Sequence, residues 1–99
     1  MYDVLKVTVA AMALALCVAP AAGQPTTCAT RAVKAEGTLA LLEGAARGNA
    51  RNAWVRRVSA SKRLGPAYAT WLRAKNPSYA CKHIGKSYSC IGSAIPCKV

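Results

Sequence analysis

Four of the five cysteines and the single histidine are the residues of this sequence whose types and spacing could perform chemistry together. Cys81 and Cys90 are separated by eight residues in CKHIGKSYSC, a stretch that includes His83, while Cys28 lies far upstream and six residues separate Cys90 from Cys97. Such a set could bind a metal ion, act as a redox pair or form covalent cross-links. The spacing differs from the C-x2-4-C pattern of most zinc sites, and no C-x-x-C redox motif is present. The sequence therefore favours disulfides and predicts no metal site and no cofactor.

The first 23 residues have the three-part layout of a secretory signal peptide. A short polar start, residues 1–6, precedes the apolar run VTVAAMALALCV and a segment of small residues that ends at Gly23. The apolar run is shorter than the ~20 residues that a membrane-spanning helix needs. We therefore predict cleavage after Ala21 or Gly23, removal of Cys17 with the peptide, and a mature protein that is periplasmic or secreted. In an oxidising compartment the remaining even number of cysteines predicts two disulfides.

The pairing of these cysteines follows from a predicted β-hairpin. The pair Gly85-Lys86 suits a type II′ turn, and counting outward from it places Cys81 opposite Cys90 at a non-hydrogen-bonded position. The Cα atoms of such a pair lie ~4.5 Å apart, within the range that a disulfide spans. We therefore predict a Cys81–Cys90 disulfide and, by elimination, a Cys28–Cys97 disulfide that ties the two ends of the mature chain together.

Residues 24–99 are predicted to form a single small, strongly basic domain. The fourteen Lys and Arg residues less Lys6 leave thirteen cations, and the three acids less Asp3 leave only Glu36 and Glu43. A domain of this size buries a limited core, and this chain contains no Phe. In the chain-entropy model the two disulfides would contribute roughly 4 and 3 kcal/mol, which exceeds the contribution of a few additional core contacts.

The residue patterns between the cysteines predict an α+β fold in the order β-α-(α)-β-β, with helices packed on one face of a short antiparallel sheet. Residues 28–36 favour a strand, with a short helix as the alternative. Residues 45–63 predict an amphipathic helix, with an earlier start near Thr38, a candidate N-cap, as the alternative. Residues 67–75 predict a second helix that Asn76-Pro77 would stop. The narrow apolar face of the first helix consists of Ala46, Ala50, Trp54, Val58 and Ser61.

Aromatic residues at helical spacing are the largest apolar side chains of the predicted domain. Trp54 lies on the first predicted helix, and Tyr68, Trp71 and Leu72 share one face of the second. Because the domain has few other large apolar residues, we expect the aromatic side chains to form most of the core rather than a recognition surface.

The stretches ARNAWVRRV, LGPAYATWLRAKN, C-x8-C and AIPC resemble a group of small exported proteins of alphaproteobacteria. The resemblance covers residues 45–97, most of the mature chain. The group has no established activity, so the resemblance implies export and paired cysteines but assigns no catalytic residue. Many such segments carry Tyr-Gly where this chain has Leu64-Gly65, so the resemblance implies no aromatic contact at that position.

The excess of positive charge is the main functional signal of the sequence. A surface rich in Lys and Arg with almost no acids attracts polyanions through long-range electrostatics, and the binding weakens as salt is added. Export makes anionic envelope components the expected partners: lipopolysaccharide, anionic lipids at a peripheral membrane contact, or acidic polysaccharide. No specific nucleic-acid recognition motif is present. The predicted anion-binding residues are Arg47, Arg51, Arg56, Lys62 and Arg63.

Two alternative functions remain open at this point. A cationic antimicrobial or host-directed effector would share the charge and the disulfides, but the alanine-rich helix face has little bulk for insertion into a membrane. A small hydrolase would use His83, which faces Tyr88 in the predicted hairpin. A catalytic histidine needs an orienting acid or a nucleophile, and both acids lie far from His83 in the sequence. We therefore predict a non-enzymatic binding or structural protein.

Overall fold

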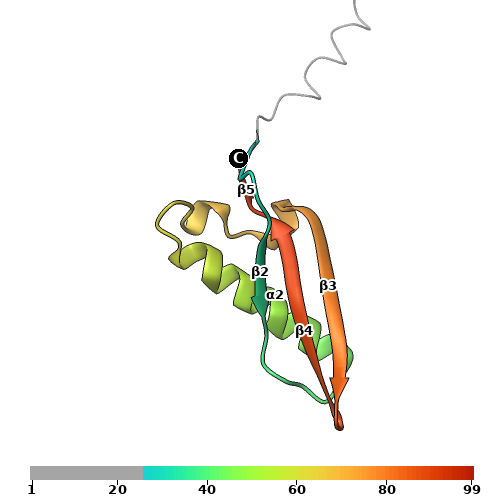
Figure 1. Cartoon of the computed structure of the whole chain (residues 1–99). Coiled ribbons are helices and arrows are strands. Elements are labelled where there is room, and N and C mark those ends of the chain that lie inside the picture. Colours follow the sequence, from blue (N-terminus) through green and yellow to red (C-terminus); the bar gives the residue numbers. More distant parts are fainter. Residues whose placement is uncertain (1–25) are drawn as a thin grey trace, which may run out of the picture.

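A computed structural model of the protein describes residues 26–99 (Figure 1). The predicted signal peptide, residues 1–23, lies outside the described residues. The elements, in chain order, are β1 (Thr27–Cys28), β2 (Val33–Glu36), α2 (Glu43–Ala60), two 3₁₀ turns η1 (Pro66–Tyr68) and η2 (Trp71–Arg73), β3 (Lys75–Ile84), β4 (Ser87–Ile95) and β5 (Cys97–Lys98). The fold is a small disulfide-stabilised α+β domain, as the sequence predicts.

The main sheet is antiparallel, with the strand order β2-β4-β3, and α2 covers one of its faces (Figure 1). A second, smaller antiparallel pair joins β1 to β5. The single strand predicted over residues 28–36 is therefore wrong in part, since the chain bends at Thr30 and Arg31. Its first residues pair with the C-terminal strand, and its last residues pair with β4.

The hairpin between β3 and β4 confirms the predicted register. Cys81 pairs with Cys90 and His83 pairs with Tyr88. Gly85 has φ 63°, and Lys86 is not among the residues with positive φ, which is the pattern of a type II′ turn. The local turn chemistry thus sets the alignment of both strands.

Both predicted disulfides are confirmed. Cys81 and Cys90 are bonded with their Cα atoms 4.0 Å apart, and Cys28 and Cys97 are bonded with their Cα atoms 3.9 Å apart. The second bond also joins directly opposed residues, because Cys28 pairs with Cys97 between β1 and β5. Each disulfide is thus a cross-strand link, and together they indicate an oxidising environment.

Helix α2 differs from its prediction at both ends. It starts at Glu43 after Leu42, which forms no side-chain cap, so the prediction that Thr38 caps the helix is wrong. It ends at Ala60 instead of Arg63, because Ser61 is extended (φ −71°, ψ 129°) and its hydroxyl accepts a hydrogen bond from the Leu64 N–H at 3.3 Å. Serine competes with the helix for backbone groups in this way.

The helix predicted over residues 67–75 is absent, and two 3₁₀ turns occupy its place. Each turn contains i→i+3 hydrogen bonds, and extended backbone at Thr70 (φ −105°, ψ 108°) separates them.

The predicted stop at Asn76-Pro77 is also wrong, because both residues lie within β3. They are accommodated since β3 is an edge strand with a register shift between Lys75 and Ser78, where a missing N–H and the φ of 52° at Asn76 are tolerated.

The core forms where α2 packs on the sheet, and the predicted small-residue face is confirmed except for Ser61, which follows the end of the helix and is half-buried. Buried along the helix are Ala46, Ala50, Trp54 and Val58. The Trp54 indole N–H donates to the carbonyl oxygen of Ala94 in β4 at 3.3 Å. Trp71 meets Trp54 edge-to-face with ring centroids 5.2 Å apart, an arrangement that adds to the stabilisation from burial. Leu72, predicted to share the face of Trp71, is instead 91% exposed.

Glycine allows the backbone of the β2–α2 connection to approach the helix closely. A Cβ atom on Gly37 would overlap the backbone N of Ala50 and lie 2.5 Å from the carbonyl carbon of Asn49 and 2.8 Å from the Cα of Ala50. The alanine face of α2 therefore permits contact between backbones. Among residues 26–99, no helix has both the length and the apolar character needed to cross a bilayer.

Candidate anion-binding surface

The packing of α2 determines which of its cations face solvent. Burial of Trp54 and its neighbours against the sheet leaves Arg47, Arg51 and Arg56 exposed. Residues four apart lie on the same side of a helix, so Arg47 and Arg51 share one flank of α2. Arg56 is two residues after Trp54, about 200° around the helix at 3.6 residues per turn, and lies on the outer side. The helix therefore displays its cations on two sides rather than in one stripe.

Arg47 is partly engaged by neighbouring side chains. Its guanidinium lies 3.2 Å from the Glu43 carboxylate in an i,i+4 ion pair, with the two side chains 51% and 46% exposed. It also lies over the Tyr79 ring of β3, 5.4 Å from the centroid. An exposed pair of this kind contributes little to stability, but it reduces the charge that Arg47 offers to a partner.

Lys62 and Arg63 follow the helix instead of lying on it. Both are exposed and belong to the turn after Ala60. Together with Leu64, Arg63 lines one side of a cleft of about 360 Å³, whose other side is formed by residues 28–33. The structure thus separates Arg63 from the helical arginines and places it beside the chain segment that Cys28 anchors.

Arg31 is a second arginine of this cleft, and no pattern in the sequence predicts it as an anion-binding residue. It lies in the bend between β1 and β2, where the Cys28–Cys97 disulfide holds the start of the segment. Thr30, which precedes Arg31 in the bend, also lines the cleft and carries a hydroxyl group. Nothing local in the sequence relates Arg31 to Arg63, because the two are brought together only by the packing of α2 on the sheet.

Two arginines that line one concave site are suited to a phosphate or carboxylate group. A guanidinium group presents its N–H donors in a planar fork that matches the oxygens of these anions. Within the described chain, neither arginine has a carboxylate partner in a salt bridge, since the only such pair there joins Arg47 to Glu43. We call the site formed by residues 28–33, Arg63 and Leu64 the arginine cleft.

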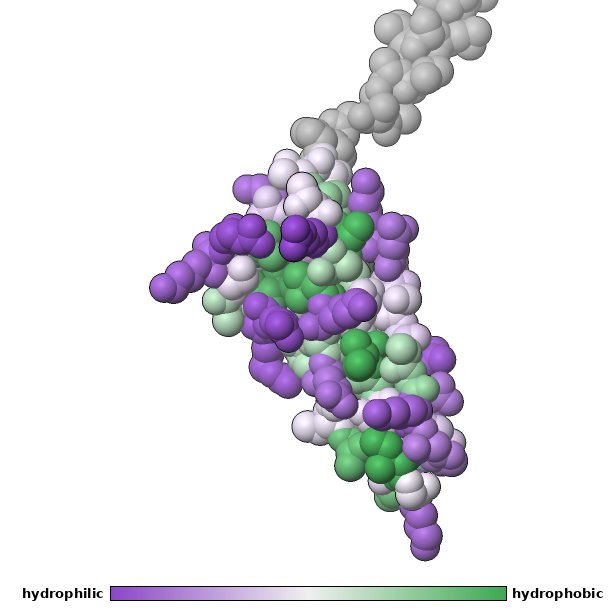
Figure 2. Space-filling model, viewed as in Figure 1, coloured by the Kyte–Doolittle hydropathy of each residue, from purple (hydrophilic) through white to green (hydrophobic). Residues whose placement is uncertain are grey.

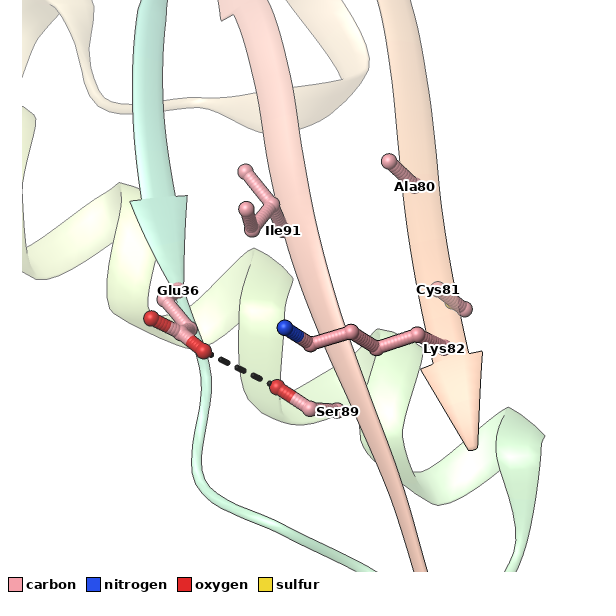
Figure 3. A pocket seen from close by; sticks show the side chains of 6 residues that line it. All are labelled: Glu36, Ala80, Cys81, Lys82, Ser89 and Ile91. Carbon is pink, nitrogen blue, oxygen red and sulfur yellow. Dashed lines mark hydrogen bonds between the residues drawn. The ribbon is translucent and has the colours of Figure 1, made fainter. Parts of the chain in front are cut away.

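The two acids of the described residues are both engaged. Glu43 pairs with Arg47, and Glu36 accepts a hydrogen bond from the Ser89 hydroxyl at 3.0 Å. Glu36 and Ser89 lie on the sheet face opposite α2, in a shallow pocket of about 160 Å³ that Lys82 and Ile91 also line (Figure 3). The acids therefore leave most of the positive surface uncompensated.

The other candidate chemistry of the sequence has no assembled centre in this part of the chain. His83 is exposed and its ring stacks on Tyr88, with centroids 4.2 Å apart and planes 17° from parallel. Residues 26–99 contain no cluster of three or more His, Cys, Asp or Glu side chains that could hold a metal ion. All four cysteines in this range are in disulfides.

Comparisons of the chain with protein-family models, curated proteins and solved structures found no match.

Proposed function

We propose that this protein is an exported, non-enzymatic binder of anionic cell-envelope components that acts in the periplasm or outside the cell after removal of its signal peptide. The observation that carries the proposal is the surface of the described domain. Residues 26–99 contain thirteen Lys and Arg residues but only two acidic residues, Glu36 and Glu43. Glu43 forms an ion pair with Arg47, and Glu36 accepts a hydrogen bond from Ser89. Twelve of these cations, all but Lys98, are exposed.

The arginine cleft supports phosphate as the preferred group of the partner. Arg31 and Arg63 line it together, and a phosphate group can bridge two guanidinium groups with charge-assisted hydrogen bonds. The cations of α2 then act as a more diffuse attractive surface that raises the local concentration of a polyanion. Phosphorylated lipopolysaccharide, phospholipid headgroups and polyphosphate all present the required group, whereas an uncharged polysaccharide does not.

The binding test uses the purified oxidised protein and soluble inorganic polyphosphate, followed by calorimetry at low and moderate salt. We expect the double variant Arg31→Gln/Arg63→Gln to bind at least tenfold more weakly than the wild type. The matched control, Lys34→Gln/Arg73→Gln, removes the same charge from exposed positions outside the cleft and should weaken binding by less. Equal effects of the two variants would refute a specific role of the cleft. Absence of polyphosphate and lipopolysaccharide binding at low salt would refute the proposed function.

A further inference from the structure

The connection between β2 and α2 runs beside the tip of the β3–β4 hairpin. Ala40 exchanges two backbone hydrogen bonds with Tyr88, at 3.1 and 2.7 Å, and forms an isolated antiparallel bridge with it. The same end of the sheet carries the hairpin turn at Gly85 (Figure 1). The arginine cleft lies at the other end, next to Val33, which pairs with Ala94 near the far end of β4.

Aliphatic side chains gather on this end and remain in solvent. Leu39 is 55% exposed, Leu41 72% and Leu42 71%, and Ile84 beside the hairpin turn is 44% exposed. We call these four residues the apolar tip. Soluble domains seldom expose such a group of large aliphatic side chains without an interaction to cover it. In Figure 2 hydrophobic atoms form a cluster at the lower end of the molecule with hydrophilic atoms around it.

The exposed leucines do not contribute to the packing of the β2–α2 connection. Ala40, between two of them, is the residue that turns inward and packs with Tyr88 against the second core cluster. Leu42 occupies the N-cap position of α2 and forms no cap hydrogen bond. Ser, Thr, Asp or Asn would stabilise the helix there by about 1 kcal/mol. A residue that is unfavourable for the local helix end and forms no compensating contact points to a functional role.

The charges around the apolar tip are positive. Lys82 and Lys86 flank Ile84 on the hairpin, and both are exposed. Glu43, which follows Leu42, is neutralised by its ion pair with Arg47. The tip is therefore a group of exposed aliphatic side chains with Lys86 in the adjacent turn, while the Lys82 side chain extends across β4 toward Glu36 and Ser89 (Figure 3).

We propose that the apolar tip inserts into the interface of an anionic phospholipid bilayer, with Lys86 against the headgroup phosphates. This inference rests on the proposed function and names the partner for this end of the molecule. Leucine side chains gain free energy when they enter the acyl boundary, and lysines near an anionic surface are attracted to it. A soluble polyanion would leave the leucines in water. A second copy of the chain docked tip to tip would bring like charges together.

The test measures binding of the oxidised protein to vesicles of phosphatidylcholine with and without phosphatidylglycerol. We expect Leu41→Ser/Leu42→Ser to lower the partition coefficient for anionic vesicles by roughly a hundredfold, about tenfold for each leucine. Leu72→Ser is the matched control, because Leu72 is 91% exposed and lies outside the apolar tip, and it should change binding less than twofold. Serine at position 42 can also cap α2, so the double variant is expected to remain folded.

Insertion depth supplies an independent readout. In a Leu41→Trp variant, brominated acyl chains should quench the added fluorescence, while Trp54 and Trp71, buried at 0% and 9% exposure, should be affected little. Unchanged vesicle binding by the double serine variant, or absence of quenching, would overturn the insertion. Dissociation of a dimer by the same substitutions without loss of vesicle binding would also overturn it. In each of these cases polyphosphate binding still decides the proposed function separately.

Discussion

The two disulfides allow a matched test of how this domain is stabilised. Each joins a fully buried cysteine, Cys90 or Cys97, to a half-buried one, Cys81 or Cys28. Each also links residues that are directly opposite in an antiparallel pair. Replacing both members of a pair with alanine therefore removes similar packing in the two cases. The length of chain that each bond closes is the main remaining difference.

The expected magnitude follows from these lengths. The Cys28–Cys97 bond spans a separation of 69 residues and the Cys81–Cys90 bond a separation of 9. The chain-entropy model assigns roughly 4.4 kcal/mol to the longer loop and roughly 2.6 kcal/mol to the shorter. We therefore expect the free energy of unfolding of Cys28→Ala/Cys97→Ala to be about 1.8 kcal/mol below that of Cys81→Ala/Cys90→Ala.

Urea unfolding without reductant measures this difference, with tryptophan fluorescence reporting on the core and circular dichroism at 222 nm on α2. The buried tryptophans make the fluorescence sensitive to loss of packing. Similar slopes against urea for the two variants would show that their unfolding exposes similar surface. Equal stabilities, or a less stable hairpin variant, would refute the argument from loop length.

Substitutions at neighbouring or matched positions test the packing in the same assay. Gly37→Ala should cost about 3 kcal/mol, since the new Cβ meets the backbone of α2. Gly48→Ala, which has no neighbouring atom within 4 Å, should raise stability by about 0.5–1 kcal/mol through helix propensity. Trp71→Ala should cost about 3 kcal/mol or more, whereas the exposed Leu72→Ala should change stability by less than about 0.5 kcal/mol. Similar costs at positions 71 and 72 would contradict the observed 3₁₀ turns.

The parts of the fold that the sequence predicts correctly are those that local chemistry determines. Gly85-Lys86 fixes the turn type, and the turn type fixes which residues of the hairpin face each other. The cysteine pairing then follows without knowledge of the remaining structure. The buried face of α2 is likewise local, because its small residues and Trp54 recur at helical spacing.

The errors lie where long-range packing competes with local preference. The pattern AYATWLRAK has helical spacing, but burial of Trp71 against Trp54 and pairing of the following residues with β4 break it into short turns. Asn76-Pro77 is a frequent breaker, yet an edge strand with a register shift accommodates it. The segment after Cys28 divides between two sheets because its first residues pair with the C-terminus.

The sequence predicts the candidate site only in part, because long-range packing also determines which of its residues lie together. The cationic character of the domain is evident from composition, and the five selected Lys and Arg residues are all exposed. The pairing of Arg31 with Arg63 around one cleft depends on tertiary structure. The apolar tip is not predicted by the sequence, because a run of leucines does not by itself indicate which of its side chains are buried, and only the bridge between Ala40 and Tyr88 shows which residue turns inward.

Export and disulfide bonding are tested most directly by the intact mass of the native, untagged protein, recovered from the cell envelope or the medium and measured before and after reduction. We expect a chain that begins near residue 24, gains the mass of four hydrogens on reduction, and gives disulfide-linked peptides for Cys28–Cys97 and Cys81–Cys90. An uncleaved chain inside the cell with free thiols would contradict both export and the stabilisation of this basic domain by two disulfides.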